Sequence, residues 1–353
     1  MNCGKDWKAK KLELKKWKEE RKLRKEERKR KREEEAQKRA QLANDASEGR
    51  NYTLSIALPA SIVDNAQTNE LKAYLIGQIA RAAVIFNCDE IVVYDEFSGN
   101  AIEEDPNVNP KKRCISKMVK VLQYLECPQY LRRYFFPIQK DLELVGLINP
   151  LDTKHHLRID DVSRFREGVV VNKPVKENSE MSFVNVGLRN DVKVDRCLKP
   201  GVRVTVEFEA QELESPKKKL RGTIVSPRTP CIKSGTYWGY SVRVANSLSE
   251  VLANSSFGEE YDLTIGTSEN GDNVDTILPQ IPNDFKHAII IFGGLKGIEA
   301  AMDADTKYAN VADPRSIFNF YLNTCPNQGS NTIRTEEAIL ISLSILRPKL
   351  TNK

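Results

Sequence analysis

The stretch Ala288-Ile289-Ile290-Ile291-Phe292-Gly293-Gly294-Leu295-Lys296-Gly297 joins a short apolar run to a loop that turns on glycines. Further along, Ile317-Phe318-Asn319-Phe320-Tyr321-Leu322 leads in the same way into Asn323-Thr324-Cys325-Pro326-Asn327-Gln328-Gly329. Apolar runs of this length are typical of buried strands. In parallel sheets, the loops after such strands bring backbone amides to a ligand. The two stretches therefore predict a cofactor site.

Upstream, the chain alternates between strand and helix patterns. Residues 52–58 and 90–94 predict strands, and residues 67–87 between them predict an amphipathic helix. A strand, a helix and a second strand in this order indicate a parallel sheet. Further helices are expected over residues 114–127 and 334–346.

Between Gly168 and Val244 the pattern changes to short alternating strands without intervening helices. They are expected over residues 169–171, 182–186, 202–206, 222–225 and 237–244. This spacing predicts a small antiparallel barrel of OB type, inserted into an α/β domain whose parallel pattern resumes at Tyr261.

Barrels of this kind often bind single-stranded nucleic acid through exposed basic and aromatic side chains. The basic residues available here are Arg189, Lys193, Arg196, Lys217, Lys218, Lys219, Arg221 and Arg228. Ordinary solvated strand faces would show the same composition, so both readings stay open.

The charge of the chain is concentrated at its beginning. The first 50 residues hold 19 basic and 11 acidic side chains, which leaves 36 basic and 38 acidic ones after Arg50. Such a tail predicts a solvated helix that binds a polyanion.

The seven cysteines form no CxxC pair, and the longest apolar stretches are only strand-sized, so we expect a reduced intracellular protein without a membrane segment.

The stretch Thr332-Ile333-Arg334-Thr335-Glu336-Glu337-Ala338 predicts a helix start, with Thr332 or Thr335 as the cap and acidic residues at the positive end. Capping does not require Arg334. The stretch is similar to the closing motif of the bacterial ribosomal-RNA uridine-N3 methyltransferases. With residues 261–271 and the two glycine-turned loops, it resembles the cofactor loops of the SPOUT methyltransferases.

The resemblance is stronger to a eukaryotic and archaeal SPOUT family of RNA methyltransferases, which shares the basic tail, the inserted barrel and Tyr237-Trp238-Gly239-Tyr240. It implies a Rossmann-like parallel sheet with a C-terminal trefoil knot. The implied organisation is a basic helical or disordered tail (1–48), a first part of the SPOUT domain (49–165), an OB-like barrel (166–235), and a second part with the knot and the cofactor site (236–353).

The cofactor implied by this resemblance is S-adenosylmethionine. The resemblance places it against Asn270, Gly293, Gly294, Asn323 and Thr324, with Gln328, Gly329 and Ile333 around the adenine. Relatives often have arginine at position 270. Arg334 is expected either to stabilise an incipient uridine anion or to hold a phosphate. Glu336 or Glu337 is expected to act as base, although each carboxylate also suits an ordinary helix start.

No metal site is expected. His155 and His156 stand beside Asp152, but adjacent histidines point in different directions in regular structure, and no second cluster completes a ligand set.

The expected function is methylation of a base nitrogen in ribosomal RNA, with uridine N3 favoured by the motif. The resemblance also implies a homodimer formed through the knot region. From the basic tail we expect a location in the nucleus, including the nucleolus, together with a cytoplasmic fraction. Two alternatives stay open: an RNA-binding adaptor that keeps the fold without catalysis, and a protein methyltransferase.

Overall fold

The computed structural model describes residues 49–96, 110–173, 181–209, 220–308 and 310–351. The predicted tail and three of the predicted basic residues, Lys217, Lys218 and Lys219, lie outside the described residues.

A six-stranded sheet forms the centre of the α/β domain, and all its strands run parallel in the order β11-β9-β10-β1-β2-β8. The strands are β1 (Thr53–Pro59), β2 (Glu90–Tyr94), β8 (Ser241–Ala245), β9 (Leu263–Asn273), β10 (His287–Phe292) and β11 (Phe320–Asn323). Since β1 and β2 precede the barrel in sequence while the other four follow it, the barrel is an insertion, as predicted.

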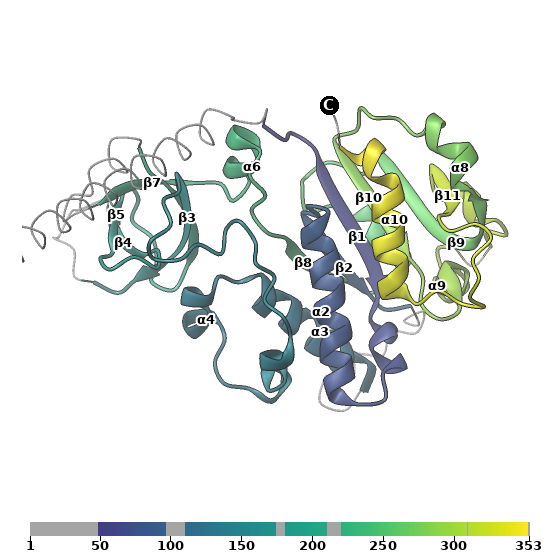
Figure 1. Cartoon of the computed structure of the whole chain (residues 1–353), viewed down its shortest axis with the longest axis horizontal. Helices are drawn as coiled ribbons and strands as arrows, with labels where there is room; N and C mark the ends of the chain where they lie inside the picture. Colours follow the sequence, from purple (N-terminus) through teal and green to yellow (C-terminus); the bar gives the residue numbers. More distant parts are fainter. Residues whose placement is uncertain (1–48, 97–109, 174–180, 210–219, 309, 352–353) are drawn as a thin grey trace, which may run out of the picture. The chain divides into compact units, whose positions relative to one another are not determined.

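Helices cover both faces of the sheet, which explains why its strands are almost continuously apolar. Ile290 and Phe292 of β10 pack with helices α2 (Asn69–Ile85), α3 (Pro110–Glu126) and α10 (Thr335–Leu350). Ile289 and Ile291 face the other way, toward α7 (Leu248–Ala253) and α9 (Gly297–Ala304). Figure 1 shows α2 and α10 side by side on the first face.

The remaining helical segments are short. They are α4 (Gln129–Phe135), α6 (Thr229–Ser234), α8 (Val274–Ile277) and the 3-10 turns Ala60–Asn65, Lys140–Leu142, Val145–Leu147, Leu278–Gln280 and Pro314–Ser316. Within the described part of the chain, no helix is both long and apolar enough to cross a membrane.

The inserted barrel has five strands and is closed in the order β3-β4-β5-β7-β6. They are β3 (Phe165–Val171), β4 (Ser182–Asn185), β5 (Val192–Val194), β6 (Arg203–Glu207) and β7 (Arg221–Val225). All neighbouring strands are antiparallel except β5 and β7, so the barrel is mixed rather than purely antiparallel. Valines fill its interior, and a Cβ at Gly168 or Gly222 would lie 2.3 Å from a valine methyl, so both positions need glycine.

Two strand predictions in this region were wrong. Strand β5 was missed because it has three residues and directly follows the turn residues Asn190 and Asp191. The segment predicted as a barrel strand over residues 237–244 instead contains β8, which pairs in parallel with β2 at the edge of the α/β sheet. The parallel pattern therefore resumes before Tyr261.

Candidate functional site

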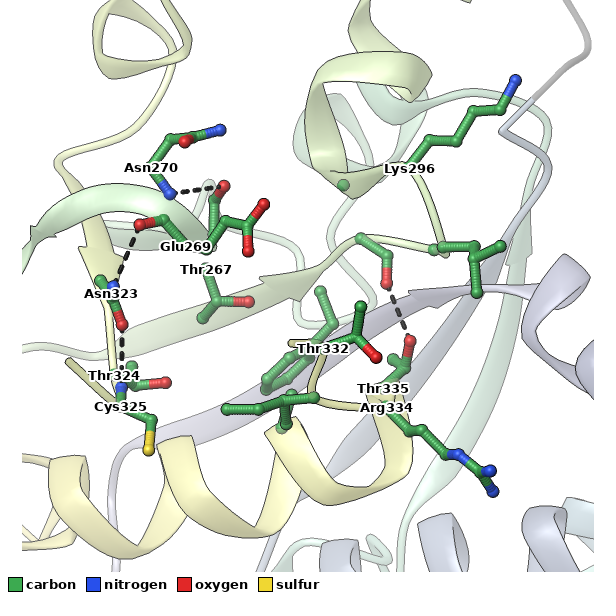
Figure 2. Close-up of a pocket in the computed structure, with 18 of the residues that line it drawn as sticks. Thr267, Glu269, Asn270, Lys296, Asn323, Thr324, Cys325, Thr332, Arg334 and Thr335 are labelled. Atoms are coloured by element: carbon green, nitrogen blue, oxygen red, sulfur yellow. Dashed lines mark hydrogen bonds between the residues drawn. The ribbon is translucent and has the colours of Figure 1, made fainter. Parts of the chain in front are cut away.

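A cavity of about 440 Å³ lies at the carboxyl ends of β9, β10 and β11 and beside the start of α10. Three segments meet there: a bulge within β9 and the loops that follow β10 and β11. Eight of the predicted site residues line the cavity: Asn270, Gly293, Gly294, Asn323, Thr324, Gln328, Ile333 and Arg334. The fold thus brings together residues that lie far apart in the sequence (Figure 2).

The first loop is a bulge within β9. Gly266 pairs with Tyr321 and Asp272 with Leu322, so residues 267–271 have no partner on β11. The side-chain amide of Asn323 donates to the carbonyl of Glu269 over 3.0 Å and holds the bulge against β11 (Figure 2). This arrangement places Asn270 at the cavity wall.

The second loop turns closely over the start of α9. A Cβ added to Gly293 would lie 2.4 Å from the carbonyl carbon of Gly297 and from the amide nitrogen of Ile298. Because both are backbone atoms, no side-chain rotation could relieve the overlap. Gly297 has φ +79, a left-handed conformation that glycine adopts at little cost. The two glycines make a loop that a larger residue could not form.

The third loop joins β11 to α10 and is fixed at both ends. The Asn323 side chain accepts from the amide of Cys325 at 3.0 Å, and the hydroxyls of Thr324 and Ser342 lie 2.7 Å apart. At the other end, the Thr335 hydroxyl donates to the carbonyl of Gly293 over 3.0 Å (Figure 2). The second and third loops are therefore tied together across the cavity.

The start of α10 differs from the predicted cap. Arg334 is the N-cap residue, and its backbone amide donates to the Glu337 carboxylate over 3.0 Å. Neither Thr332 nor Thr335 caps the helix. Glu337 is thus committed to capping, and it does not line the cavity.

Two predicted site residues are not part of the cavity wall. Glu336 is buried at the helix start and is absent from the lining, because a helix turns its side chains by about 100° per residue and directs it away from the face of Thr335. Gly329 is exposed, and a Cβ there would meet nothing within 4 Å.

Glu299 lines the cavity and was missed from the sequence. One of its carboxylate oxygens accepts hydrogen bonds from the hydroxyls of Tyr321 (2.7 Å) and Ser268 (3.0 Å) and from the side-chain amide of Asn270 (3.2 Å). Burial opposes ionisation, but the hydrogen bonds from Tyr321, Asn270, Ser268 and its own backbone lower the pKa of the Glu299 carboxyl. The ionised group fixes the bulge of β9 and is a poor proton acceptor.

The cavity carries its positive charge at one end. Figure 2 shows Lys296 and Arg334 on the opposite side of the cavity from Asn270 and Asn323. A wall of polar side chains and close backbone turns suits a small polar molecule, and the cationic edge suits an anionic one.

A second cavity, of about 780 Å³, is lined in part by Glu126, Glu167 and Arg203, which pair with one another. Arg203 donates to Glu126 over 2.7 Å and to Glu167 over 2.8 Å. Burial opposes ionisation of Glu126, yet the Arg203 guanidinium lowers its pKa to about 2. The arrangement links barrel strand β6 to the end of α3 and leaves these groups no reactive role.

The two adjacent histidines lie in irregular backbone, and the prediction that they point in different directions is wrong. The Nε2 atoms of His155 and His156 lie 2.9 and 2.7 Å from the carbonyl oxygen of Glu126. Within the described ranges, no group of three or more His, Cys, Asp or Glu side chains is placed to hold a metal ion.

The sequence of this chain is similar to those of known RNA methyltransferases. The family model described as "Putative RNA methyltransferase" matches residues 53–346. The chain is 53% identical to the mouse 28S rRNA (uridine-N(3))-methyltransferase over 312 residues, covering 88% of this chain and 80% of that protein. The human protein of the same name is 52% identical over 311 residues, covering 87% and 81%.

Among solved structures, the SpoU methyltransferase AviRb from Streptomyces viridochromogenes in complex with AdoMet aligns over 86% of this chain and 60% of that one. Its TM-score is 0.30 and its identity 11%, too low to carry an argument. The family match and the two mammalian relatives suffice: the chain belongs to this family of RNA methyltransferases.

Proposed function

We propose that this protein transfers a methyl group from S-adenosylmethionine to N3 of a uridine in large-subunit ribosomal RNA. The observation that carries the proposal is the match to two relatives named 28S rRNA (uridine-N(3))-methyltransferase, each more than half identical to this chain. The cavity supplies a site in which that chemistry can take place.

The residues present fit the cofactor. A volume of about 440 Å³ lies within the range of small-ligand sites. Gly293 and Gly294 allow the backbone to approach a ligand closely, and Asn323 and Thr324 offer polar groups at the wall. S-adenosylmethionine would supply a methyl group on a positively charged sulfur. We place its adenine between Gln328 and Ile333, and we omit Gly329 because it is not part of the wall.

The cationic edge suits the RNA. Arg334 would stabilise the negative charge that develops on uridine when its N3 proton leaves. The new bond joins N3 to the methyl carbon as the carbon–sulfur bond breaks, and the proton goes to a base. Since Glu336 is outside the cavity and Glu299 holds the bulge, we assign this proton to Glu269, the exposed carboxylate of the wall.

We also propose a homodimer. A shallow groove on the outer side of α10 is lined by Leu340, Ile341, Ile345 and Pro326, and Leu340 is 39% exposed. The groove shares Thr324, Cys325 and Ile341 with the cofactor cavity, so a second copy seated there would lie at the edge of the site. Light scattering should give a dimer for the wild type and a monomer for Leu340→Glu; a monomeric wild type would contradict the proposal.

The trefoil knot and the nuclear location also belong to this proposal. Support for the knot is the strand order, because β11 follows β10 in sequence but pairs with β9 on the side away from β10. The basic tail would add salt-sensitive affinity for RNA phosphates and direct nuclear import. Removal of residues 1–48 from a fluorescent fusion should shift it to the cytoplasm, and an unchanged nuclear signal would contradict this role.

The direct test is transfer of labelled methyl from S-adenosylmethionine into RNA from cells that lack this protein. Label should enter a large ribosomal RNA with the wild type and not with Gly293→Asp, because the added side chain overlaps backbone at 2.4 Å. No label, despite measured cofactor binding, would leave a protein acceptor or a non-catalytic RNA-binding role.

A further inference from the structure

The outer face of the barrel carries an aromatic and basic row that the fold aligns across three strands. By strand register, Val171 of β3 lies opposite Phe183 of β4, Phe183 opposite Lys193 of β5, and Lys193 opposite Arg221 of β7. We call Phe183, Lys193 and Arg221 the barrel row. These residues come from separate parts of the sequence, and only the strand pairing places them in line.

The barrel row faces outward. Along β4 and β5, Val184, Val192 and Val194 are buried in the barrel interior, whereas Phe183 and Lys193 alternate with them and are only half-buried. Arg221 is exposed. The Phe183 ring is therefore partly accessible from outside the barrel, where an aromatic side chain can stack on a base.

Positive charge predominates around the barrel row. The ammonium group of Lys173 lies 5.9 Å from the centre of the Phe183 ring, and Arg189 and Arg196 are exposed nearby in sequence. The two acidic residues that flank β5 are engaged: Asp191 pairs with Lys173, and Asp195 accepts from the amide of Ile224 over 2.9 Å. Neither Lys193 nor Arg221 forms an ion pair with another described residue.

We propose that the barrel row binds a single-stranded segment of the RNA substrate, with a base stacked on Phe183 and adjoining phosphates on Lys193 and Arg221. This inference rests on the proposed function. Stacking on an aromatic ring requires an unpaired base, because the faces of paired bases are covered by their neighbours in a duplex. Flanking cations at strand spacing suit a phosphate backbone that runs across the strands.

One of the basic residues predicted to bind nucleic acid, Arg228, does not belong to this surface. Arg228 precedes α6 outside the barrel, and its guanidinium lies 5.2 Å from the ring of Phe257. The proposal therefore excludes Arg228 and adds Phe183, which the sequence did not single out.

The test measures binding of the full chain to a labelled oligouridine of about 12 nucleotides and to a duplex of the same length, by fluorescence anisotropy. Phe183→Ala should weaken single-strand binding roughly tenfold, and Phe183→Tyr should retain it. Lys193→Glu with Arg221→Glu should weaken single-strand binding further. The slope of log affinity against log salt concentration should become shallower by the amount expected for the loss of about two phosphate contacts. Lys140→Glu, an exposed charge reversal on a different element, is the matched control.

The outcomes separate the barrel row from the catalytic proposal. Weakened RNA binding with unchanged S-adenosylmethionine binding and an unchanged melting temperature supports the row, even if no methyl transfer is found. Equal RNA binding by wild type and both sets of variants overturns it, even if the wild type methylates RNA. Duplex binding as tight as single-strand binding, or loss of binding in Lys140→Glu alone, also overturns it.

Discussion

The side-chain hydroxyl of Thr335 donates a hydrogen bond to the main-chain carbonyl of Gly293, 3.0 Å away, and so ties the start of α10 to the loop after β10. Both residues line the cavity, and they come from two different loops. The bond therefore sets the distance between two of the three loops that would hold the cofactor.

Replacing Thr335 with valine keeps the shape of the side chain and removes this donor. Loss of one such bond costs about 1 kcal/mol, so we expect roughly fivefold weaker S-adenosylmethionine binding by calorimetry. Thr335→Ser should bind like the wild type because it retains the hydroxyl. Equal weakening in both variants would show that the methyl group, not the hydrogen bond, matters.

Gly293 and Gly329 should respond differently to replacement by alanine. At Gly293 the new Cβ overlaps backbone at 2.4 Å, so Gly293→Ala must displace the loop at a cost of about 1–3 kcal/mol. At Gly329 the new Cβ meets nothing within 4 Å, and the change should stay within about 0.5 kcal/mol. Melting temperature and cofactor affinity report both effects. A Gly329→Ala defect as large as that of Gly293→Ala would restore Gly329 to the site.

Glu299 should stabilise the fold in a pH-dependent way. Its pKa is lowered in the folded state, so its contribution is complete above the ordinary carboxyl pKa and is lost as pH falls through the lower folded-state value. Glu299→Gln should lower the free energy of unfolding by about 1 kcal/mol at pH 7, since the amide oxygen still accepts hydrogen bonds. Denaturant unfolding at a series of pH values from 7 downward should show this difference shrinking in acid; a constant difference would contradict the linkage.

Glu269 should matter for the reaction and not for cofactor affinity. As the proposed base it acts only when the N3 proton leaves, so Glu269→Gln should lower kcat by roughly 10²–10⁴ and leave S-adenosylmethionine affinity unchanged. Glu336→Gln is the comparison, because Glu336 does not line the cavity. A larger loss in Glu336→Gln would return the role of base to the helix start.

Arg334 should act on the transition state. Removing one group that stabilises developing charge costs about 3 kcal/mol, or roughly 10²-fold in kcat. Arg334→Ala should show this loss with cofactor affinity preserved, and Arg334→Lys should recover part of it because the positive charge remains. If the variants raise only the KM for RNA, Arg334 holds a phosphate instead.

The parts of the fold that could be predicted from sequence are those with a simple burial pattern. Strands β2 and β10 are continuous apolar runs in the sheet interior, and they begin and end within one residue of the predicted positions. Strand β8 was assigned to the barrel because it alternates. It lies at the edge of the sheet, where Arg243 turns inward to pair with buried Glu90 at 3.0 Å, a contact that no local pattern reveals.

Within the site, glycines and polar loop residues were predictable and carboxylate roles were not. Glu299 stands three residues after Lys296 at the beginning of α9, where an acidic residue is expected in any helix. Only the fold brings Tyr321 and Ser268 to it. Glu336 was predicted as a site residue because it is an acidic residue at a helix start. Its neighbour Thr335 lines the cavity, and Glu336 does not.

The central claim is tested most directly by identifying the nucleoside that is methylated. RNA from cells lacking this protein would be incubated with the purified full chain and S-adenosylmethionine, digested to nucleosides and analysed by mass spectrometry, with Gly293→Asp in parallel. The account predicts 3-methyluridine from large-subunit ribosomal RNA with the wild type alone. A methyl group on another nucleoside, or on protein while RNA stays unmodified, would contradict it.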